Sequence, residues 1–222
     1  MATVLLFGDS NTHGTAPMAA LRDRVRFDAA TRWPGHLARA LPGVTFVEEG
    51  HPGRTTVHDD PIEGAHRNGA AVLPALLESH APLDAVVIML GTNDMKARFS
   101  VTAVDVALSV ERLGRMVQAW GCGPGQGAPR LLLVAPPPVE EVGCLAGMFA
   151  GGAAKSRRLA AELAPVAARL GAGFVDAGAL IAVSPVDGVH YDAAAHARLG
   201  AALAPAVAAL LDLQGGDDAE RS

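Results

Sequence analysis

The chain has 222 residues, of which 50% are hydrophobic but only 4% aromatic, and its formal net charge is −5. This length and composition predict one domain, residues 1–213, with a core of Ala, Val and Leu and a polar tail at 214–222. The negative charge, without any clustered basic run, argues against nucleic acid as a partner, because phosphate binding needs a positive surface. Two cysteines are too few for a disulfide framework and fit a reducing compartment.

The first predicted strand begins at residue 3. Neither the basic segment nor the long apolar segment of a signal peptide precedes it. No uncharged apolar stretch approaches the length of a membrane span. We therefore expect a cytoplasmic protein with no membrane partner.

Apolar runs alternate with helical segments along the chain. The apolar runs predict strands at residues 3–7, 44–48, 84–90, 130–135 and 173–175. Helices are predicted at residues 34–41, 69–80, 102–120, 152–170 and 192–211. Strands separated by helices indicate parallel βαβ units. The predicted fold class is α/β, a three-layer α/β/α sandwich with a five-stranded parallel sheet.

Three long connections each follow a predicted strand, at residues 12–33, 50–68 and 136–151. Because the strands are parallel, the three connections should line the same rim of the sheet. Loops of this length usually carry function.

Ser10 lies in the run Gly8-Asp9-Ser10-Asn11, directly after the first predicted strand. Parallel sheets bind ligands outside the carboxyl ends of their strands, so this hydroxyl is placed at a binding edge. An ordinary strand-to-helix turn has the same composition, with Asp, Ser or Asn as the N-cap. The motif therefore needs support from elsewhere in the chain.

Two later segments supply that support. Asn93 follows the third predicted strand and is either a turn residue or an amide donor aimed at the same edge. Near the C-terminus, Asp187 precedes His190 by three residues, with Gly188 allowing the chain to bend. The aspartate can then orient the imidazole of a Ser-His-Asp triad. A single D-x-x-H is also common in surface turns, but the segments of Ser10, Asn93 and His190 in this order, two of them at strand ends, favour a functional site over chance turns.

On these segments the chain resembles the SGNH hydrolases, also called the GDSL-type esterase/lipase family. Ser10, Asn93 and His190 match the first, third and last family blocks, and Gly53 in the run EGHPGRTT matches the second. The likeness extends from about residue 3 to about residue 211. It is strongest toward bacterial arylesterase/acyltransferase members, through GTNDMKARF at 91–99 and VDGVHY at 186–191.

The resemblance implies a flavodoxin-like strand order and hydrolysis of small carboxylic esters through an acyl-enzyme. It makes Ser10 the nucleophile, His190 the base and Asp187 the orienting acid. It assigns the oxyanion hole to the backbone N–H groups of Ser10 and Gly53 and to the side-chain amide of Asn93. Water or an alcohol would accept the acyl group, so acyl transfer to alcohols is a second activity that the resemblance implies.

Three residues beside the motifs are candidates for substrate binding: Asn11, His13 and Arg54. Loop solvation and surface charge are the alternative interpretations for them. His196 is expected to pack inside the last helix, which Asp192 caps. The acidic and histidine residues between positions 187 and 196 lack metal-ligand spacing, so we expect neither metal nor cofactor.

Other functions stay open at this stage. A carbohydrate acetyl esterase, a lysophospholipase or a thioesterase would share the fold and the triad. From another class, a non-catalytic α/β binding protein would keep a triad-like turn but would not be labelled at Ser10 by an organophosphate. Long loops and an Ala-rich surface are compatible with a homo-oligomer but do not require one.

Overall fold

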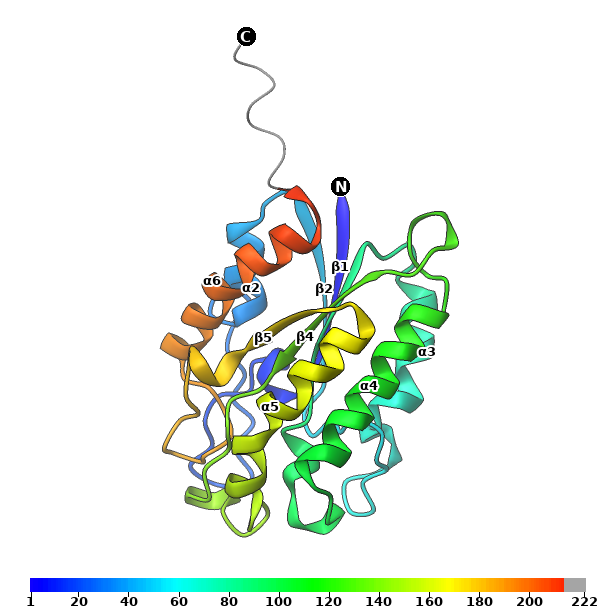
Figure 1. Ribbon diagram of the computed structural model, residues 1–222. Helices are drawn as coiled ribbons and strands as arrows, with labels where there is room; N and C mark the ends of the chain where they lie inside the picture. Colours follow the sequence, from blue (N-terminus) through cyan, green and yellow to red (C-terminus); the bar gives the residue numbers. More distant parts are fainter. Residues whose placement is uncertain (214–222) are drawn as a thin grey trace.

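The structure is a computed structural model that describes residues 1–213; the predicted tail, 214–222, lies outside the described residues. Its centre is one parallel sheet of five strands (Figure 1): β1 (Ala2–Gly8), β2 (Val44–Gly50), β3 (Ala85–Met89), β4 (Arg130–Ala135) and β5 (Gly173–Asp176). The strand order is β2-β1-β3-β4-β5, which is the flavodoxin-like order. The predicted sheet and its order are therefore confirmed.

Five helices cover the two faces of the sheet. One face is covered by α2 (Trp33–Ala40) and α6 (Ala193–Leu210), and the other by α3 (Gly69–Ser79), α4 (Ala103–Ala119) and α5 (Gly152–Leu170), as Figure 1 shows. Each predicted helix lies within one residue of its observed bounds at both ends. The three-layer α/β/α sandwich is confirmed.

The core is divided in two by the sheet. On β1, Leu5 and Phe7 pack into the cluster under α3, α4 and α5, while Val4 and Leu6 pack into the cluster under α2 and α6. Because both faces of the strand are buried, it needs apolar side chains at consecutive positions. This explains why the central strands appear in the sequence as continuous apolar runs rather than as alternating apolar and polar residues.

Helix α6 is long and apolar enough to cross a membrane by length and composition, and it is the one such helix among residues 1–213. Its Leu199, Leu203 and Val207 are buried in the cluster that contains Trp33 of α2. In this fold α6 therefore serves as a core helix. Asp192 caps its first turn, accepting a hydrogen bond from the Ala195 backbone N–H at 2.7 Å, as predicted.

The sequence did not predict a short helix, α1 (Ser10–His13), at the end of β1. Its Asp9 cap is a local feature, but a four-residue helix is too short to show a helical period in the sequence. Glycine at the end of β2 allows α1 to lie close, because a Cβ at Gly50 would sit 2.2 Å from the His13 nitrogen. The carboxyl ends of β1 and β2 therefore meet at the start of α1.

Candidate active site

Ser10 is the first residue of α1, and its hydroxyl is not used to cap the helix. Asp9 is the N-cap residue, and its Oδ1 accepts a hydrogen bond from the Asn11 backbone N–H at 2.9 Å. The Ser10 hydroxyl is thus left available while the backbone around it is fixed. Its strand, β1, lies between β2 and β3, so the loops after those two strands flank the serine.

The structure brings Ser10, His190 and Asp187 together from opposite ends of the chain. His190 Nε2 lies 3.1 Å from Ser10 Oγ, and His190 Nδ1 lies 2.7 Å from Asp187 Oδ2. All three residues are buried, with at most 5% of each exposed. Gly188 has the positive φ of 73° that the turn between Asp187 and His190 requires. This is the geometry of a nucleophile, a base and an orienting acid.

The Asp187 carboxylate is held by backbone donors as well as by His190. Oδ1 accepts from the N–H groups of Val189 and His190, and Oδ2 accepts from the Met18 N–H at 2.7 Å. Burial alone would raise the pKa of this carboxyl group, but these hydrogen bonds and the adjacent imidazole lower it to about 2. Asp187 is therefore ionised at neutral pH and can orient His190.

Gly53 lies on the loop after β2 and lines the same cavity as Ser10. Its φ of +75° is in the left-handed region, where side chains are disfavoured. An added Cβ would also lie 2.7 Å from Glu63 Oε2. The backbone conformation therefore favours glycine here, and a Cβ would also have to displace the Glu63 carboxylate.

Asn93 follows β3, at the start of the 3-10 helix η2 (Asn93–Met95), and also lines the cavity. Its Nδ2 donates to the Arg54 carbonyl at 3.1 Å and makes a longer contact of 3.4 Å with Asp9 Oδ2. Burial raises the pKa of Asp9 to about 6, although hydrogen bonds from Asn11 and Thr92 and nearby positive charge oppose the shift. One amide hydrogen of Asn93 is thus firmly held, and the other makes only the long contact.

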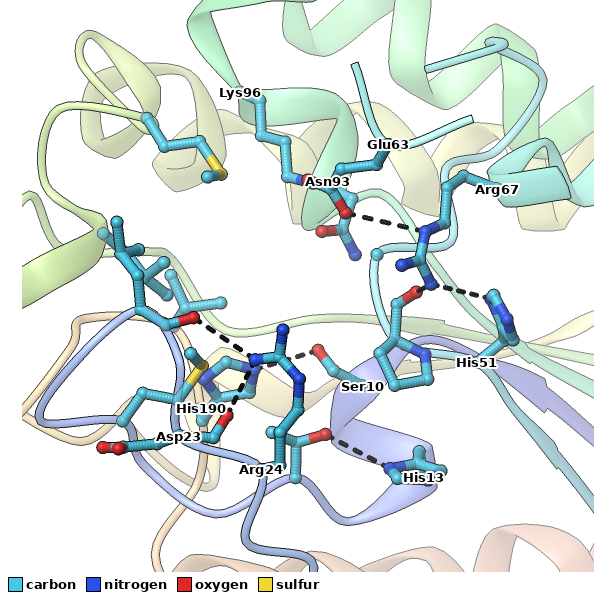
Figure 2. A pocket seen from close by; sticks show the side chains of 18 of the residues that line it. Ser10, His13, Asp23, Arg24, His51, Glu63, Arg67, Asn93, Lys96 and His190 are labelled. Carbon is cyan, nitrogen blue, oxygen red and sulfur yellow. Dashed lines mark hydrogen bonds and ion pairs between the residues drawn. The ribbon is translucent and has the colours of Figure 1, made fainter. Parts of the chain in front are cut away.

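These residues open into one cavity of about 590 Å³, a size that suits a small-molecule ligand. Figure 2 shows Ser10 and His190 facing each other on its floor, with Lys96, Glu63 and Arg67 on one wall. An apolar wall is formed by Met18, Leu145, Met148, Phe149 and Val189. All three long connections contribute lining residues, which confirms that they share one rim.

Two of the three candidate substrate-binding residues do not line the cavity. Asn11 is 1% exposed; its Nδ2 donates to the Val189 carbonyl and its Oδ1 accepts from the Tyr191 N–H. It connects α1 to the loop that carries His190, which is why its side chain points into the protein. The prediction for Asn11 is therefore corrected to a buried structural contact.

Arg54 is also turned away from the cavity. It donates to the carbonyls of Gly8 and Glu49, and its guanidinium carbon lies 4.4 Å from the centre of the Phe7 ring. The prediction that it binds substrate is corrected, because these contacts hold the loop after β2 against the ends of β1 and β2. The third candidate, His13, does line the cavity, with Nδ1 3.2 Å from Thr15 Oγ1.

His196 lies inside α6, as predicted, and accepts a hydrogen bond at Nδ1 from the Trp33 backbone N–H at 3.2 Å. It is fully buried, and burial is the main cause that lowers its pKa to about 4. It makes no contact with Ser10 Oγ. Within residues 1–213, no group of three or more His, Cys, Asp or Glu side chains is placed to hold a metal ion.

An ion-pair network beside the cavity was not predicted as a unit. Lys96 is 3% exposed, and its Nζ lies 2.7 Å from Glu63 Oε1 and 3.7 Å from Asp60 Oδ2. Arg98 also contacts Asp60, at 2.9 Å, and Arg67 Nε lies 3.6 Å from Glu63 Oε2. The network joins the loop that carries Gly53 to the loop that carries Asn93. Except for Arg67–Glu63, these pairs join residues 33 to 38 positions apart in the chain, so no local sequence pattern predicts them.

The comparison with protein families decides the identity. The model of the GDSL-like lipase/acylhydrolase family matches residues 6–198. The chain belongs to the GDSL-like lipase/acylhydrolase family. The resemblance drawn from the four motifs is thereby confirmed, and the GDSL-family protein is a carboxylic ester hydrolase that acts on small-molecule esters with water as acceptor.

Two solved structures of high similarity are esterases. An aryl esterase from M. smegmatis has a TM-score of 0.90 at 40% sequence identity, covering 95% of this chain and 100% of its own. A carbohydrate acetylesterase from Sinorhizobium meliloti has the same TM-score, identity and coverage of both chains. No curated protein sequence matches the chain. Both similar structures therefore support ester hydrolysis as the reaction of this GDSL-family member.

Proposed function

We propose that this hydrolase is a serine esterase in which Ser10 attacks small carboxylic esters and becomes acylated. The observation that carries the proposal is the 3.1 Å contact between Ser10 Oγ and His190 Nε2, with His190 Nδ1 bound to Asp187. His190 takes the hydroxyl proton as the Ser10 Oγ bonds to the carbonyl carbon. It then returns the proton to the leaving alcohol, and water resolves the acyl-enzyme by the same steps.

The oxyanion hole in this proposal consists of the N–H groups of Ser10 and Gly53 and the amide of Asn93. All three residues line one cavity, and β1 holds Ser10 between the loops of the other two. The Asn93 hydrogen that makes only the 3.4 Å contact with Asp9 is the one available to donate to the oxyanion. Its other hydrogen stays on the Arg54 carbonyl and keeps the amide in place.

The cavity has two unlike walls, which suits an ester with two unlike ends. Met148 and Phe149 belong to the apolar wall, which can accept a short acyl chain or an aryl group, whereas Glu63 and Lys96 belong to a polar wall. Acyl transfer to alcohols is part of the proposal, because an alcohol that reaches the acyl-enzyme competes with water. With an aryl acetate as donor, a primary alcohol should yield alkyl acetate.

Deacetylation of a carbohydrate is the second candidate function. The polar wall and the cavity-lining His13 and His51 offer hydrogen bonds to sugar hydroxyls, and the similar S. meliloti structure is a carbohydrate acetylesterase. Lysophospholipase and thioesterase activities stay predictions. So do the cytoplasmic location, the lack of nucleic-acid or membrane partners, and the homo-oligomer.

The test is a panel of aryl, alkyl and sugar acetates and longer acyl esters, run with Ser10→Ala and His196→Ala. We expect aryl acetates to be cleaved with a burst of phenol, and an organophosphate to label Ser10 alone. The His196→Ala variant should retain a burst, while Ser10→Ala should show neither burst nor labelling. Turnover of Ser10→Ala at the wild-type rate would exclude the serine mechanism.

A further inference from the structure

Arg67 donates a hydrogen bond from Nη1 to the backbone carbonyl of Pro52. That carbonyl belongs to the same peptide unit as the N–H of Gly53, which is one of the proposed oxyanion donors. The side chain is only 20% exposed and lines the cavity. An arginine thus contacts the far end of a peptide whose near end is proposed to bind the developing charge.

The direction of this peptide follows from its geometry. Among residues 1–213 the one cis peptide bond is Ala81–Pro82, so the Pro52–Gly53 bond is trans. In a trans peptide, C=O and N–H point in opposite directions. Fixing the Pro52 carbonyl on Arg67 therefore fixes the Gly53 N–H on the opposite side. The left-handed φ of Gly53, +75°, lets the chain turn directly after this peptide.

Arg67 is itself held in place by two neighbours, as Figure 2 shows. Its Nε lies 3.6 Å from Glu63 Oε2, and its Nη1 lies 3.3 Å from His51 Nδ1. Burial and the positive charge of Arg67 lower the pKa of His51 to about 4, so the imidazole is neutral at pH 7 and accepts this hydrogen bond. Glu63 is held in turn by Lys96 at 2.7 Å. These contacts favour the guanidinium position in which Nη1 donates to the Pro52 carbonyl.

We propose that Arg67 is a positioning residue that aligns and polarises the Pro52–Gly53 peptide so that the Gly53 N–H binds the oxyanion more strongly. A cation on the carbonyl oxygen draws electron density from the peptide and strengthens its N–H as a donor. The benefit is larger in the transition state, where the negative charge develops, than in the bound ester. This inference rests on the proposed role of Gly53 in ester hydrolysis.

The alternative is that Arg67 has a purely structural role and only holds its loop through a backbone carbonyl, as other arginines do. Arg26 provides the matched control, because its Nε donates to the His13 carbonyl at 2.7 Å. The N–H of that peptide, on Gly14, is already bound to the Ser10 carbonyl and cannot face a substrate. Losing Arg26 therefore removes the same kind of contact without affecting an oxyanion donor.

The experiment compares Arg67→Met, Arg67→Lys and Arg26→Met with the wild type on an aryl acetate. Three constants are measured: kcat, KM, and the inhibition constant of an aryl trifluoromethyl ketone, which forms a tetrahedral oxyanion on serine. For Arg67→Met we expect kcat to fall about tenfold, less than for loss of a whole oxyanion donor. The inhibition constant should rise by a similar factor while KM changes little. Arg67→Lys should recover part of kcat and part of the inhibitor affinity, and Arg26→Met should match the wild type.

The proposal is overturned if Arg67→Met keeps the wild-type kcat, or if it changes KM alone. It is also overturned if Arg26→Met lowers kcat equally. If Arg67→Met does not fold, Arg67→Gln, which keeps a neutral donor to Pro52, should show a smaller loss of kcat and of inhibitor affinity, and wild-type values would overturn the proposal. Failure of the underlying esterase mechanism is distinguished by the wild type itself, since an organophosphate would then fail to label Ser10.

Discussion

The site has two sides: a triad side with Asp187 and His190, and an oxyanion side with Gly53 and Asn93. Hydrogen bonds to one carboxylate hold the triad side, whereas ion pairs hold the oxyanion side. On the triad side, Asp187 accepts from backbone N–H groups and from His190, and no Lys or Arg within residues 1–213 forms an ion pair with it. On the oxyanion side, Glu63 contacts both Lys96 and Arg67. The two sides meet at Ser10.

This difference in contacts matches the charge that develops on each side in the proposed mechanism. His190 must gain and lose a proton, and a fixed cation bonded to the pair would oppose the protonated form. In the proposed mechanism the oxyanion side instead stabilises negative charge, and a cation behind the Pro52–Gly53 peptide favours it. The ion pairs on the oxyanion side contain three cations, Lys96, Arg67 and Arg98, and two carboxylates, Glu63 and Asp60. Four substitutions test this division, beginning with the one that should have the largest effect.

Asp187→Asn should lower kcat by about 10⁴-fold, because an amide orients the wrong imidazole tautomer. It should also cost stability. The pKa of Asp187 lies at about 2, below the ordinary 3.8, so its stabilisation is complete above about pH 4 and is lost as the pH falls toward 2. Urea unfolding should show a deficit of about 2 kcal/mol at pH 6 that shrinks at pH 3.

The control for this substitution is Asp192→Asn, since asparagine caps a helix about as well as aspartate. It should leave both kcat and stability close to the wild-type values. A pH-independent deficit in Asp187→Asn would mean that packing rather than charge explains its stability loss.

Asn93→Ala should lower kcat by about 10²–10³-fold with a smaller change in KM, as expected for loss of one oxyanion donor. Steady-state kinetics on an aryl acetate measure both constants. Asn68→Ala is the matched control: Asn68 caps α3, so its loss should cost about 1 kcal/mol of stability and leave kcat unchanged. A rise in KM at constant kcat would instead make Asn93 a ground-state binding residue.

Gly53→Ala should lower kcat about tenfold, equivalent to about 1.4 kcal/mol. The φ of +75° disfavours alanine and should shift the donor peptide, and the new methyl group, 2.7 Å from Glu63 Oε2, should displace the carboxylate that contacts Arg67. Gly171→Ala separates the two causes, because Gly171 has φ +60° and open space around it. Both variants should lose stability in urea, but only Gly53→Ala should lose kcat.

Asn11→Ala should have the smallest effect on catalysis and should leave substrate preference unchanged. It removes the contacts with Val189 and Tyr191 and leaves buried backbone groups unpaired, at a cost of about 1–3 kcal/mol. Thermal unfolding and the ester panel measure the two quantities. A changed ranking of esters would contradict the structural role and restore Asn11 as a binding residue.

Local chemistry explains what could be predicted before the fold was known. Continuous apolar runs locate strands that are buried on both faces, and the D-x-x-H spacing with Gly188 suffices to bring Asp187 to His190. These features depend on a few neighbouring residues. The five helices that cover the sheet could be predicted for the same reason, since capping and apolar periodicity are local, whereas α1 has only four residues and shows no period.

The direction of the side chains next to the motifs could not be predicted. Asn11 and Arg54 stand beside Ser10 and Gly53 in the sequence, yet both point into the protein, because the packing of α1 and of the β2 loop decides which side faces the cavity. The Met18 N–H bond to Asp187 joins residues 169 positions apart. No pattern of neighbours indicates such a contact.

The sequence by itself thus determined the α/β sandwich, the positions of its five strands and of the five helices that cover them, and the four motifs, because each depends on local periodicity, turn chemistry or short spacing. Only the tertiary structure decided how the oxyanion side is supported. The contacts of Lys96 with Glu63 and of Arg67 with the Pro52 carbonyl arise when the loops after β2 and β3 fold against each other. Their energies depend on burial and distance, which exist only once the sheet has brought those loops to the same edge.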